Sequence, residues 1–392
     1  MDGKDKRLLV FALAKSGCMA YTGQMLTAFQ GVELVVFASA YTQEPLPEQT
    51  RFVKTYRNVI ELIFNTFWIL PQLLWQLKKH SRQAYRHAWF PVFHPWNLFL
   101  LPACKLLKIR SCLTVHDGVL HTGENHPLLQ WWENACIQMA DELVFLSRYA
   151  QEQTLQKIGY TAPAHVIPHG ILNSGKQVSQ RSLPAQPRLL FLGRIVRYKG
   201  LELLLEAVQK LNASSFSHLT VAGMAVHSDV PGPVSDKIRY LTHWLTEEEI
   251  HQLLREHDIL VLPYTEASQS GVLTLGISAA IPMLCTKVGG LPEQLAEDEA
   301  VWTEPTTESI QKDLSLLLSD ADWYKQLHQK LLLKRTQTGW ENAVETLIKI
   351  IFSGPKCAPH TSLPRSLPPR FLPPHRPEDR LSADATKNRS AD

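Results

Sequence analysis

The sequence predicts an α/β protein made of two doubly wound parallel sheets. A chain of 392 residues is long for one domain and favours two domains of about 150–200 residues each. Hydrophobic residues make up 45% of the chain and charged residues 20%, a balance that supports a buried core. Short apolar runs alternate with helical patterns along most of the sequence, which is typical of parallel sheets covered by helices.

Nine apolar runs are predicted as buried strands. They span residues 8–13, 33–37, 111–115, 142–146, 165–168, 188–192, 218–222, 259–263 and 283–286. Amphipathic patterns over residues 201–211 and 247–256 predict helices between some of them, and a small-residue stretch, 273–280, predicts another. In such sheets, ligands bind at the carboxyl ends of the strands.

Changes in composition divide the chain. Segment 173–187, with its Ser, Gln and Pro content, is predicted as a linker between a first domain, 1–172, and a second, 188–335. Residues 354–392 hold eight of the 25 prolines and few large apolar residues, so we expect a disordered or extended tail. Six cysteines without a C-x-x-C pair argue against a zinc site and fit a reducing compartment.

Neither long apolar run predicts a membrane span. The run at residues 8–14 follows a start that mixes acids with bases, so it is predicted as a strand and not as a signal peptide. The run 62–75 is interrupted by Asn65, Thr66, Pro71 and Gln72 and is shorter than the about 20 apolar residues that a spanning helix needs.

The stretch 191–200 predicts an anion site. A strand ends at Leu192, Gly193 allows a close turn, and Arg194 and Lys199 follow before a helix starts at Leu201. Two cations beside a helix N-terminus suit a diphosphate. A solvated basic turn is the alternative.

A second stretch carries similar chemistry. The strand at residues 258–264 runs into a Ser- and Gly-rich loop, 265–272, that precedes the predicted helix 273–280. Backbone N–H groups of such a loop can bind an anion or a sugar hydroxyl, and Gly289 with Gly290 permits close approach of a ligand. Ordinary turn chemistry is the alternative here.

Together these stretches resemble the retaining GT-B glycosyltransferases of family 4, glycosyl transferases group 1, over residues 7–353. The matching pieces, in order, are the turn at Gly17, 114–117, 166–170, Gly193-Arg194 with Lys199-Gly200, 219–223, 261–263, Gly289-Gly290 with Pro292-Glu293, and a final helix from Trp340. The resemblance implies two Rossmann-like domains that face each other across a cleft, the first binding the acceptor and the second the nucleotide-sugar donor. It also implies a helix over 336–353 that crosses back to the first domain.

The resemblance assigns roles to individual residues. Catalytic roles fall on Arg194 and Lys199, which would hold the donor diphosphate without a metal, and on His116, which would contact the donor sugar. The full donor-binding set is Gly17, His169, Gly193, Arg194, Lys199, Ser268, Gln269, Ser270, Gly271, Val272 and Glu293. The acceptor side is expected to include Asp117, His121 and Glu124. A metal cluster of His116, Asp117, His121 and Glu124, or a core role for His116, is the alternative.

One departure concerns a pair of glutamates that the family usually carries in the donor loop. Alignment on Gly271 places the two positions at Ser268 and Gly276. The second glutamate of the family binds the ribose, which glycine cannot do. We expect Glu266 or Glu293 to compensate.

Segment 51–110 predicts contact with an anionic surface. It holds ten basic residues and one acid, Glu61, interleaved with twelve aromatic residues. This pattern favours peripheral docking on an anionic membrane over nucleic acid, for which no motif is present. Some of the aromatic residues are expected to be core.

The function predicted from these features is that of a retaining glycosyltransferase in bacterial surface-polysaccharide biosynthesis. Its acceptor would be lipid-linked or an oligosaccharide, and it would lie at the cytoplasmic membrane face with no cofactor or metal. The alternatives are a non-catalytic GT-B scaffold or nucleotide-sugar-binding subunit, and a nucleotide-sugar epimerase of the same fold.

Overall fold

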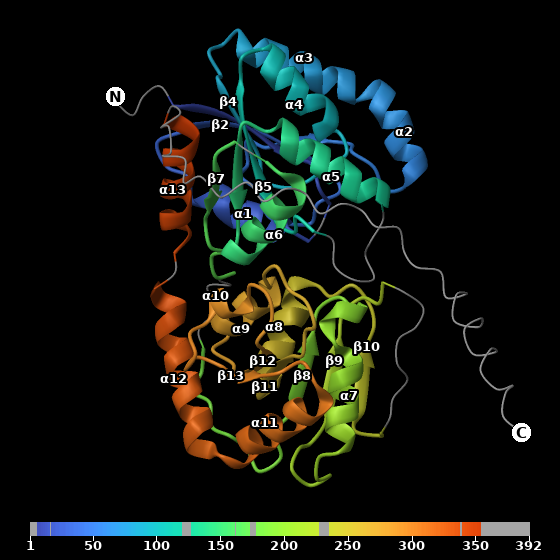
Figure 1. The fold of residues 1–392 in the computed structure, drawn as a ribbon, viewed down its shortest axis with the longest axis vertical. Coiled ribbons are helices and arrows are strands. Elements are labelled where there is room, and N and C mark those ends of the chain that lie inside the picture. The colour runs from blue at the N-terminus through green and yellow to red at the C-terminus, as the bar shows by residue number, and fades with distance from the viewer. Residues whose placement is uncertain are drawn as a thin grey trace, which may run out of the picture. The chain divides into compact units, whose positions relative to one another are not determined.

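Two parallel sheets, each covered by helices, form the body of the protein in this computed structural model (Figure 1). The structure describes residues 6–15, 17–119, 127–160, 162–172, 178–226, 235–337 and 339–353. His121, Glu124 and the predicted tail lie outside the described residues. The predicted α/β class with two doubly wound sheets is confirmed. The domain boundaries given above stay predictions.

The first sheet has seven parallel strands in the order β3-β2-β1-β4-β5-β6-β7. The strands are β1 (Arg7–Ala12), β2 (Glu33–Ser39), β3 (Arg51–Val53), β4 (His87–Phe90), β5 (Arg110–Val115), β6 (Glu142–Phe145) and β7 (Ala164–Val166). Its connecting helices are α1 (Met19–Ala28), α2 (Val59–Trp68), α3 (Leu70–Ser81), α4 (Asn97–Leu106), α5 (Pro127–Met139) and α6 (Arg148–Ile158).

The second sheet has six parallel strands in the order β10-β9-β8-β11-β12-β13. The strands are β8 (Leu189–Leu192), β9 (Leu219–Ala222), β10 (Ile238–Leu241), β11 (Ile259–Leu262), β12 (Met283–Thr286) and β13 (Val301–Thr303). The helices are α7 (Leu201–Gln209), α8 (Glu247–Glu256), α9 (Gly271–Ser278), α10 (Leu291–Gln294), α11 (Thr307–Ser319), α12 (Ala321–Gln337) and α13 (Trp340–Phe352), with a 3₁₀ turn η1 (Arg197–Lys199).

Both faces of each sheet are buried, which explains why its central strands are almost wholly apolar. Along β1, Leu9 and Phe11 pack with α3, α4 and α5, whereas Leu8 and Val10 pack with α1 and α13. Along β8 the same alternation separates a layer of α7 and α11 from a layer of α8 and α9. The last helix, α13, therefore completes the core of the first sheet although α12 packs against α9 on the second.

Strand order reverses once in each sheet, between β1 and β4 and between β8 and β11. At such a switch point the loops leaving two neighbouring strands diverge and open a crevice at their carboxyl ends. The predicted diphosphate stretch leaves β8, and the predicted Ser- and Gly-rich loop leaves β11. The topology thus brings the two motifs to one switch point.

All nine predicted strands are present, and the described residues form four further short strands that were not predicted. Three of these, β3, β10 and β13, are edge strands, and β3 and β10 carry exposed residues that break the apolar pattern. The fourth, β4, has four residues and pairs with β1 and β5 in the middle of the sheet. The interrupted run 62–75 forms parts of α2 and α3, and no helix in the described part of the chain combines the length and apolarity of a membrane span.

Candidate active site

A glycine turn at the end of β8 opens the site. Gly193 has φ +115°, and a Cβ there would lie 3.2 Å from a Val272 methyl and 3.8 Å from the Lys199 ammonium. Behind it, a Cβ on Gly223 would lie 2.1 Å from the carbonyl oxygen of Gly193. Only glycine fits these two positions, and their packing brings the β8 loop against the first turn of α9.

The ammonium of Lys199 is held inside the protein by a phenol. Its Nζ donates to the Tyr264 hydroxyl at 2.6 Å and lies 4.0 Å from the centroid of that ring. Lys199 is 9% exposed and Tyr264 is 1% exposed. Burial raises the pKa of the Tyr264 hydroxyl well above its usual range, so the phenol stays neutral beside the cation. The structure thus fixes a positive charge at the second switch point.

The N-terminus of α9 lies beside this cation. The Ser270 hydroxyl caps the helix by accepting from the Leu273 amide at 3.2 Å, and it lies 3.3 Å from the Tyr264 hydroxyl. The Gln294 side chain clamps the Ser270 backbone from the other side. The buried Oε1 of Gln269 has no hydrogen-bond partner among the described residues. The N-terminus of α9 can bind a phosphate, and the nearby Gln269 oxygen can accept a hydrogen bond from a sugar hydroxyl.

Arg194 has a more exposed place than Lys199. Its guanidinium donates to the Tyr198 hydroxyl at 3.4 Å, and its charge lowers the pKa of both Tyr264 and Cys18 against the larger effect of burial. Cys18 follows the Gly17 turn of the first sheet. The charge of Arg194 therefore acts between the two switch-point loops.

His116 ends β5 as a buried, neutral imidazole. Its Nε2 donates to the carbonyl of Pro91 at 2.9 Å, and its ring lies perpendicular to that of Tyr21, with the two ring centroids 5.1 Å apart. Burial lowers its pKa, so Nδ1 carries the free lone pair at neutral pH. The residue is buried as a core histidine would be, but one ring nitrogen remains able to accept a hydrogen bond.

His169 lies in an aromatic cluster with Tyr21, His116 and Trp340. Its Nδ1 donates to the Gly170 carbonyl at 2.6 Å, and burial lowers its pKa to about 4. Its ring centroid lies 5.4 Å from that of Tyr21 and 5.6 Å from that of Trp340. The structure thus gives the predicted donor-binding His169 a packing role that joins α1 to α13.

Predicted acceptor-side Asp117 belongs to an acidic group beside Gly17. Burial raises the pKa of Cys18 to about 12, and the carboxylates of Asp117 and Glu133 add to this rise. Burial and Asp117 together raise the pKa of Glu133 to about 8. Gly17 itself has φ +73°, a backbone that favours glycine, and no atom of the described residues lies within 4 Å of a Cβ built there.

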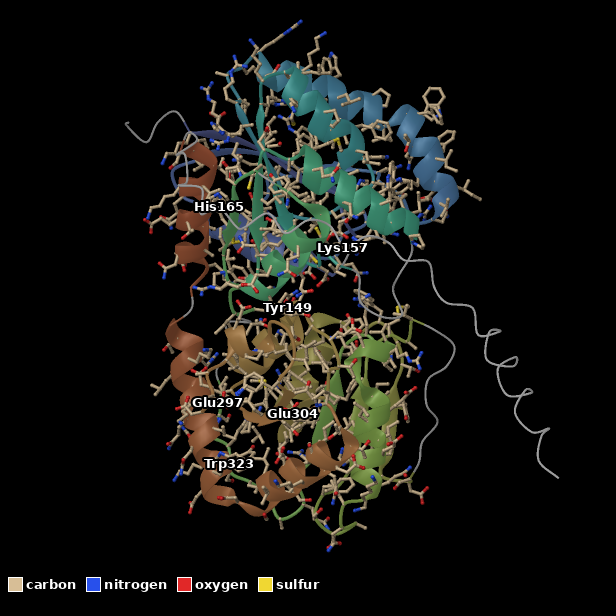
Figure 2. The ribbon with its side chains drawn as sticks, in the orientation of Figure 1. Tyr149, Lys157, His165, Glu297, Glu304 and Trp323 are labelled. Atoms are coloured by element: carbon tan, nitrogen blue, oxygen red, sulfur yellow. The ribbon has the colours of Figure 1, made fainter. Side chains whose placement is uncertain are left out.

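The loops of the second sheet are tied to α6 of the first. The Ser147 hydroxyl, which caps α6, donates to the Ser268 carbonyl at 2.6 Å. Both oxygens of Glu293 accept from α6, from the amides of Arg148 at 2.7 Å and Tyr149 at 2.8 Å (Tyr149 is labelled in Figure 2). We expected Ser268 and Glu293 to bind the donor, and the structure shows both in contacts that join the two sheets.

The second glutamate position of the family is closed to any side chain here. A Cβ on Gly276 would lie 2.5 Å from the sulfur of Met283 and 2.8 Å from a methyl of Leu260, so this position faces the sheet. The neighbouring Leu275 instead lines a cavity. Helix α9 therefore turns Gly276 toward the sheet and the apolar Leu275 toward the cavity.

Sequence reasoning missed several residues of this site. Tyr264 ends the segment 258–264 but received no role, because its partner Lys199 lies 65 residues away in the chain. Glu133 and Ser147 lie on or at helices with no motif of their own. The capping pattern at Ser147 is the one signal that could have indicated a helix start there.

Comparison with known proteins relates the chain to glycosyltransferases. Residues 19–172 match the family model described as Glycosyltransferase Family 4, and residues 186–320 match the one described as Glycosyl transferases group 1. The solved structure of Anabaena HepE in complex with UDP and glucose matches with a TM-score of 0.67 at 13% identity, over 88% of this chain and 99% of that chain. The fold is that of the GT-B glycosyltransferases. Family models and fold agree on the class of enzyme that the sequence predicts.

Curated relatives match over shorter spans. A Xanthomonas campestris protein named GDP-mannose:glycolipid 4-beta-D-mannosyltransferase is 26% identical over 223 residues, which cover 52% of this chain and 61% of that protein. A Bacillus subtilis protein named as a teichuronic acid biosynthesis glycosyltransferase, TuaC, is 24% identical over 176 residues, which cover 42% of this chain and 43% of that protein. The chain thus spans about half the length of the curated relatives it matches.

Proposed function

We propose that this GT-B protein transfers a sugar from a nucleotide-sugar donor to a lipid-linked or oligosaccharide acceptor. The observation that carries the proposal is the buried Lys199 ammonium, held by Tyr264 beside the N-terminus of α9. A nucleoside diphosphate gains negative charge as the glycosidic bond breaks, and a fixed cation with aligned N–H groups stabilises that charge. The UDP and glucose bound by HepE, and the GDP-mannose in the name of the Xanthomonas protein, support a donor of this class.

In the proposed reaction an acceptor hydroxyl oxygen bonds to the anomeric carbon while the bond from that carbon to the diphosphate oxygen breaks. Arg194 and Lys199 neutralise the departing diphosphate, and the reaction needs no metal or cofactor. Gln269 Oε1 and His116 Nδ1 can each accept a hydrogen bond from a sugar hydroxyl. Retention of configuration, with the acceptor proton passing to the leaving phosphate on the same face, is proposed from the family resemblance.

We further propose that the protein works on the cytoplasmic face of an anionic membrane in surface-polysaccharide synthesis. Helix α2 has no buried residue, and six of its large apolar side chains are more than half exposed. Lys78 and Lys79 lie exposed in the last turn of the adjoining α3. An apolar helix face beside cations suits a lipid surface. Other aromatic residues of 51–110, including Trp89, Phe90 and Trp96, are core, as expected for some of them.

The donor site is tested with Lys199→Ala and a matched surface control, Lys210→Ala, whose ammonium pairs with exposed Glu308. Release of nucleoside diphosphate is measured with UDP-glucose, GDP-mannose and other nucleotide sugars, in the presence of polyprenyl-diphosphate-linked sugars. We expect Lys199→Ala to lose transfer while its thermal unfolding stays cooperative, and Lys210→Ala to keep it. Near-normal turnover by Lys199→Ala would overturn the proposal, and the anomeric proton coupling of the product tests retention.

Membrane docking is tested with a double variant of α2, Phe64→Ser with Phe67→Ser. The control is Leu333→Ser on α12, a residue that is also well exposed. Co-sedimentation with phosphatidylglycerol-rich vesicles should fall for the double variant and stay at the wild-type level for the control. Equal binding of the wild-type and double-variant proteins would contradict the docking proposal.

A further inference from the structure

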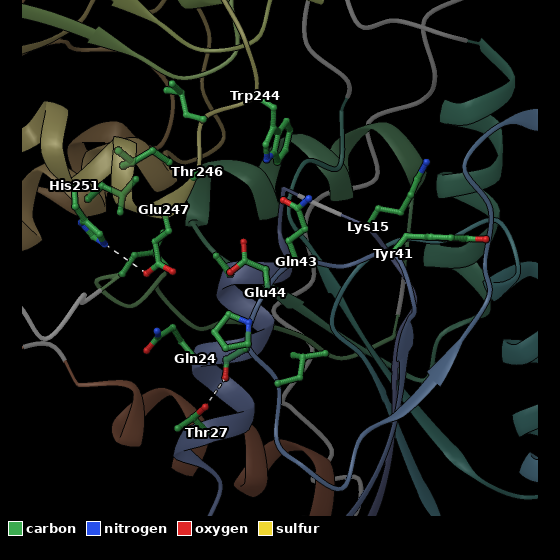
Figure 3. A pocket seen from close by; sticks show the side chains of 18 of the residues that line it. Lys15, Gln24, Thr27, Tyr41, Gln43, Glu44, Trp244, Thr246, Glu247 and His251 are labelled. Atoms are coloured by element: carbon green, nitrogen blue, oxygen red, sulfur yellow. Dashed lines mark hydrogen bonds and ion pairs between the residues drawn. The ribbon is translucent and has the colours of Figure 1, made fainter. Parts of the chain in front are cut away.

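A cavity of about 610 Å³ lies next to the candidate active site and takes its walls from both sheets (Figure 3). The first sheet contributes α1 and the loop at residues 41–48, and the second contributes residues 244–251 and Leu275. Its volume is within the range of small-molecule sites. We call it the inter-sheet cavity.

The inter-sheet cavity begins one helical turn from the proposed diphosphate site. On α9, Leu275 lies four residues after Gly271, whose turn contacts the β8 loop region. On α1, Ala20 lies three residues after the Gly17 turn. One turn of helix rises about 5.4 Å. A diphosphate bound between the Gly17 turn and the first turn of α9 would therefore place a group attached to it within reach of this cavity. The nucleoside end of a nucleotide sugar is such a group.

The charges of the cavity exclude a further anion. Three carboxylates line it, those of Glu44, Glu48 and Glu247, against one ammonium, that of Lys15. The Lys15 ammonium already donates to the Arg57 carbonyl at 3.2 Å and lies 5.0 Å from the Tyr56 ring. Of these carboxylates, Glu247 lies 3.4 Å from the His251 ring nitrogen, whereas Glu44 and Glu48 have no cationic partner among the described residues. Two unpaired carboxylates favour a ligand that presents N–H or O–H donors.

Glu44 is a half-buried carboxylate of the cavity wall whose oxygens are available to a ligand. Burial together with the charge of Glu247 raises its pKa. No hydrogen bond or ion pair of its carboxylate is found within the described residues. Figure 3 shows Glu44, Gln43, Trp244 and Glu247 directed into the same space. Trp244 is 48% exposed, so a planar ring can stack on its face.

We propose that the inter-sheet cavity selects guanine as the base of the donor, with the Glu44 carboxylate accepting from the guanine N1–H and 2-amino groups and Trp244 stacking on the purine. Two adjacent, parallel N–H donors match the two oxygens of a carboxylate. Uracil offers a single N–H between two carbonyl oxygens, which a carboxylate repels. Adenine and cytosine offer an amino group next to a ring-nitrogen acceptor. This inference rests on the proposed function and adds the nucleotide class to it.

The experiment is isothermal titration calorimetry of the full chain with GDP, UDP, ADP and CDP. Wild type should bind GDP roughly tenfold or more tightly than UDP, as a fork of two hydrogen bonds to a charged group allows. Glu44→Gln keeps the size of the side chain but removes the charge, and it should bring the GDP and UDP affinities close together. Glu256→Gln, at the exposed end of α8, is the matched control and should keep the wild-type preference.

The possible failures are distinct. Tighter binding of UDP than of GDP by wild type, or a GDP preference unchanged in a folded Glu44→Gln protein, overturns the guanine assignment and leaves the glycosyltransferase proposal intact. An unchanged preference combined with a raised KM for the acceptor would assign the cavity to the acceptor sugar, which also overturns it. Absence of binding by every nucleoside diphosphate overturns the proposed function itself.

Discussion

The pairing of Lys199 with Tyr264 yields the sharpest prediction about catalysis. Tyr264→Phe removes one oxygen atom and keeps the ring, so the ammonium loses a 2.6 Å hydrogen bond but retains the aromatic face 4.0 Å away. A hydrogen bond that involves a charged group contributes about 1.5–3 kcal/mol. Because the ring still attracts the cation, we expect the net loss to lie toward the lower end of that range.

This loss converts into a rate. If the hydrogen bond fixes Lys199 where the leaving diphosphate develops its charge, about 1.5–3 kcal/mol corresponds to a decrease of about 10- to 150-fold. Because that charge grows in the transition state, the decrease should fall on kcat more than on KM for the donor. Lys199→Ala removes the cation altogether and should cost about 100- to 1000-fold or more.

The assay is initial-rate release of nucleoside diphosphate over a range of donor concentrations, with thermal unfolding of each variant. Thr306→Ala is the matched control, because it removes the cap of α11, a helix that is not part of the candidate active site. Loss of this helix cap should lower stability by about 1 kcal/mol and leave kcat closer to wild type. A folded Tyr264→Phe enzyme with wild-type kcat would refute the idea that the phenol positions the lysine.

Three further predictions concern stability. Gly200 and Gly159 both have left-handed backbones, with φ +67° and φ +66°. A Cβ on Gly200 would lie 1.9 Å from the backbone oxygen of Pro263, whereas one on Gly159 has no described atom within 4 Å. Gly200→Ala should therefore lower the denaturation midpoint far more than Gly159→Ala, and equal shifts would contradict the packing. Glu293→Gln should lower the free energy of unfolding by about 0.3–1 kcal/mol, because a neutral amide interacts more weakly than a carboxylate with the N-terminus of α6. A slightly lower melting temperature would show this loss, and an unchanged melting curve would contradict a stabilising role for the Glu293 carboxylate. The pKa of His169 is about 4 in the folded protein against 6.5 in the unfolded chain, so the unfolded state takes up the proton first as the pH falls. The free energy of unfolding should therefore decrease by up to about 3 kcal/mol between pH 6.5 and pH 4. Urea midpoints measured over this pH range should fall less for His169→Gln than for wild type, and an equal fall would contradict the role of His169.

The fold was largely readable from the sequence because both sheets are buried on both faces. Strands such as β8 and β11 are continuous apolar runs between turn residues, and the helix at 247–256 has a capping box that marks its start. The strand β4 was not predicted because Arg86 and Pro91 leave only four residues between them, too few for a clear apolar pattern. Its place in the middle of the sheet depends on pairing with β1 and β5, which the local sequence does not show.

The candidate site was readable only in part. A motif with a glycine turn and two cations located Lys199, but whether that lysine is solvated or buried depends on the loop that leaves β11. Glu293 shows the opposite case, because a carboxylate after a glycine pair looks available for a ligand until the N-terminus of α6 is placed against it. Contacts between segments more than a hundred residues apart leave no local signal in a single sequence.

The place of α13 has a consequence for biosynthesis. Trp340, Val344, Leu347 and Ile351 complete a core whose other members come from the first sheet, yet they are translated after the whole second sheet. At about 5–20 residues per second, a ribosome needs roughly ten to thirty seconds to add the chain between the two parts of this core. During that interval the nascent first sheet has an uncovered apolar face, where a chaperone or a membrane could bind before the last helix arrives.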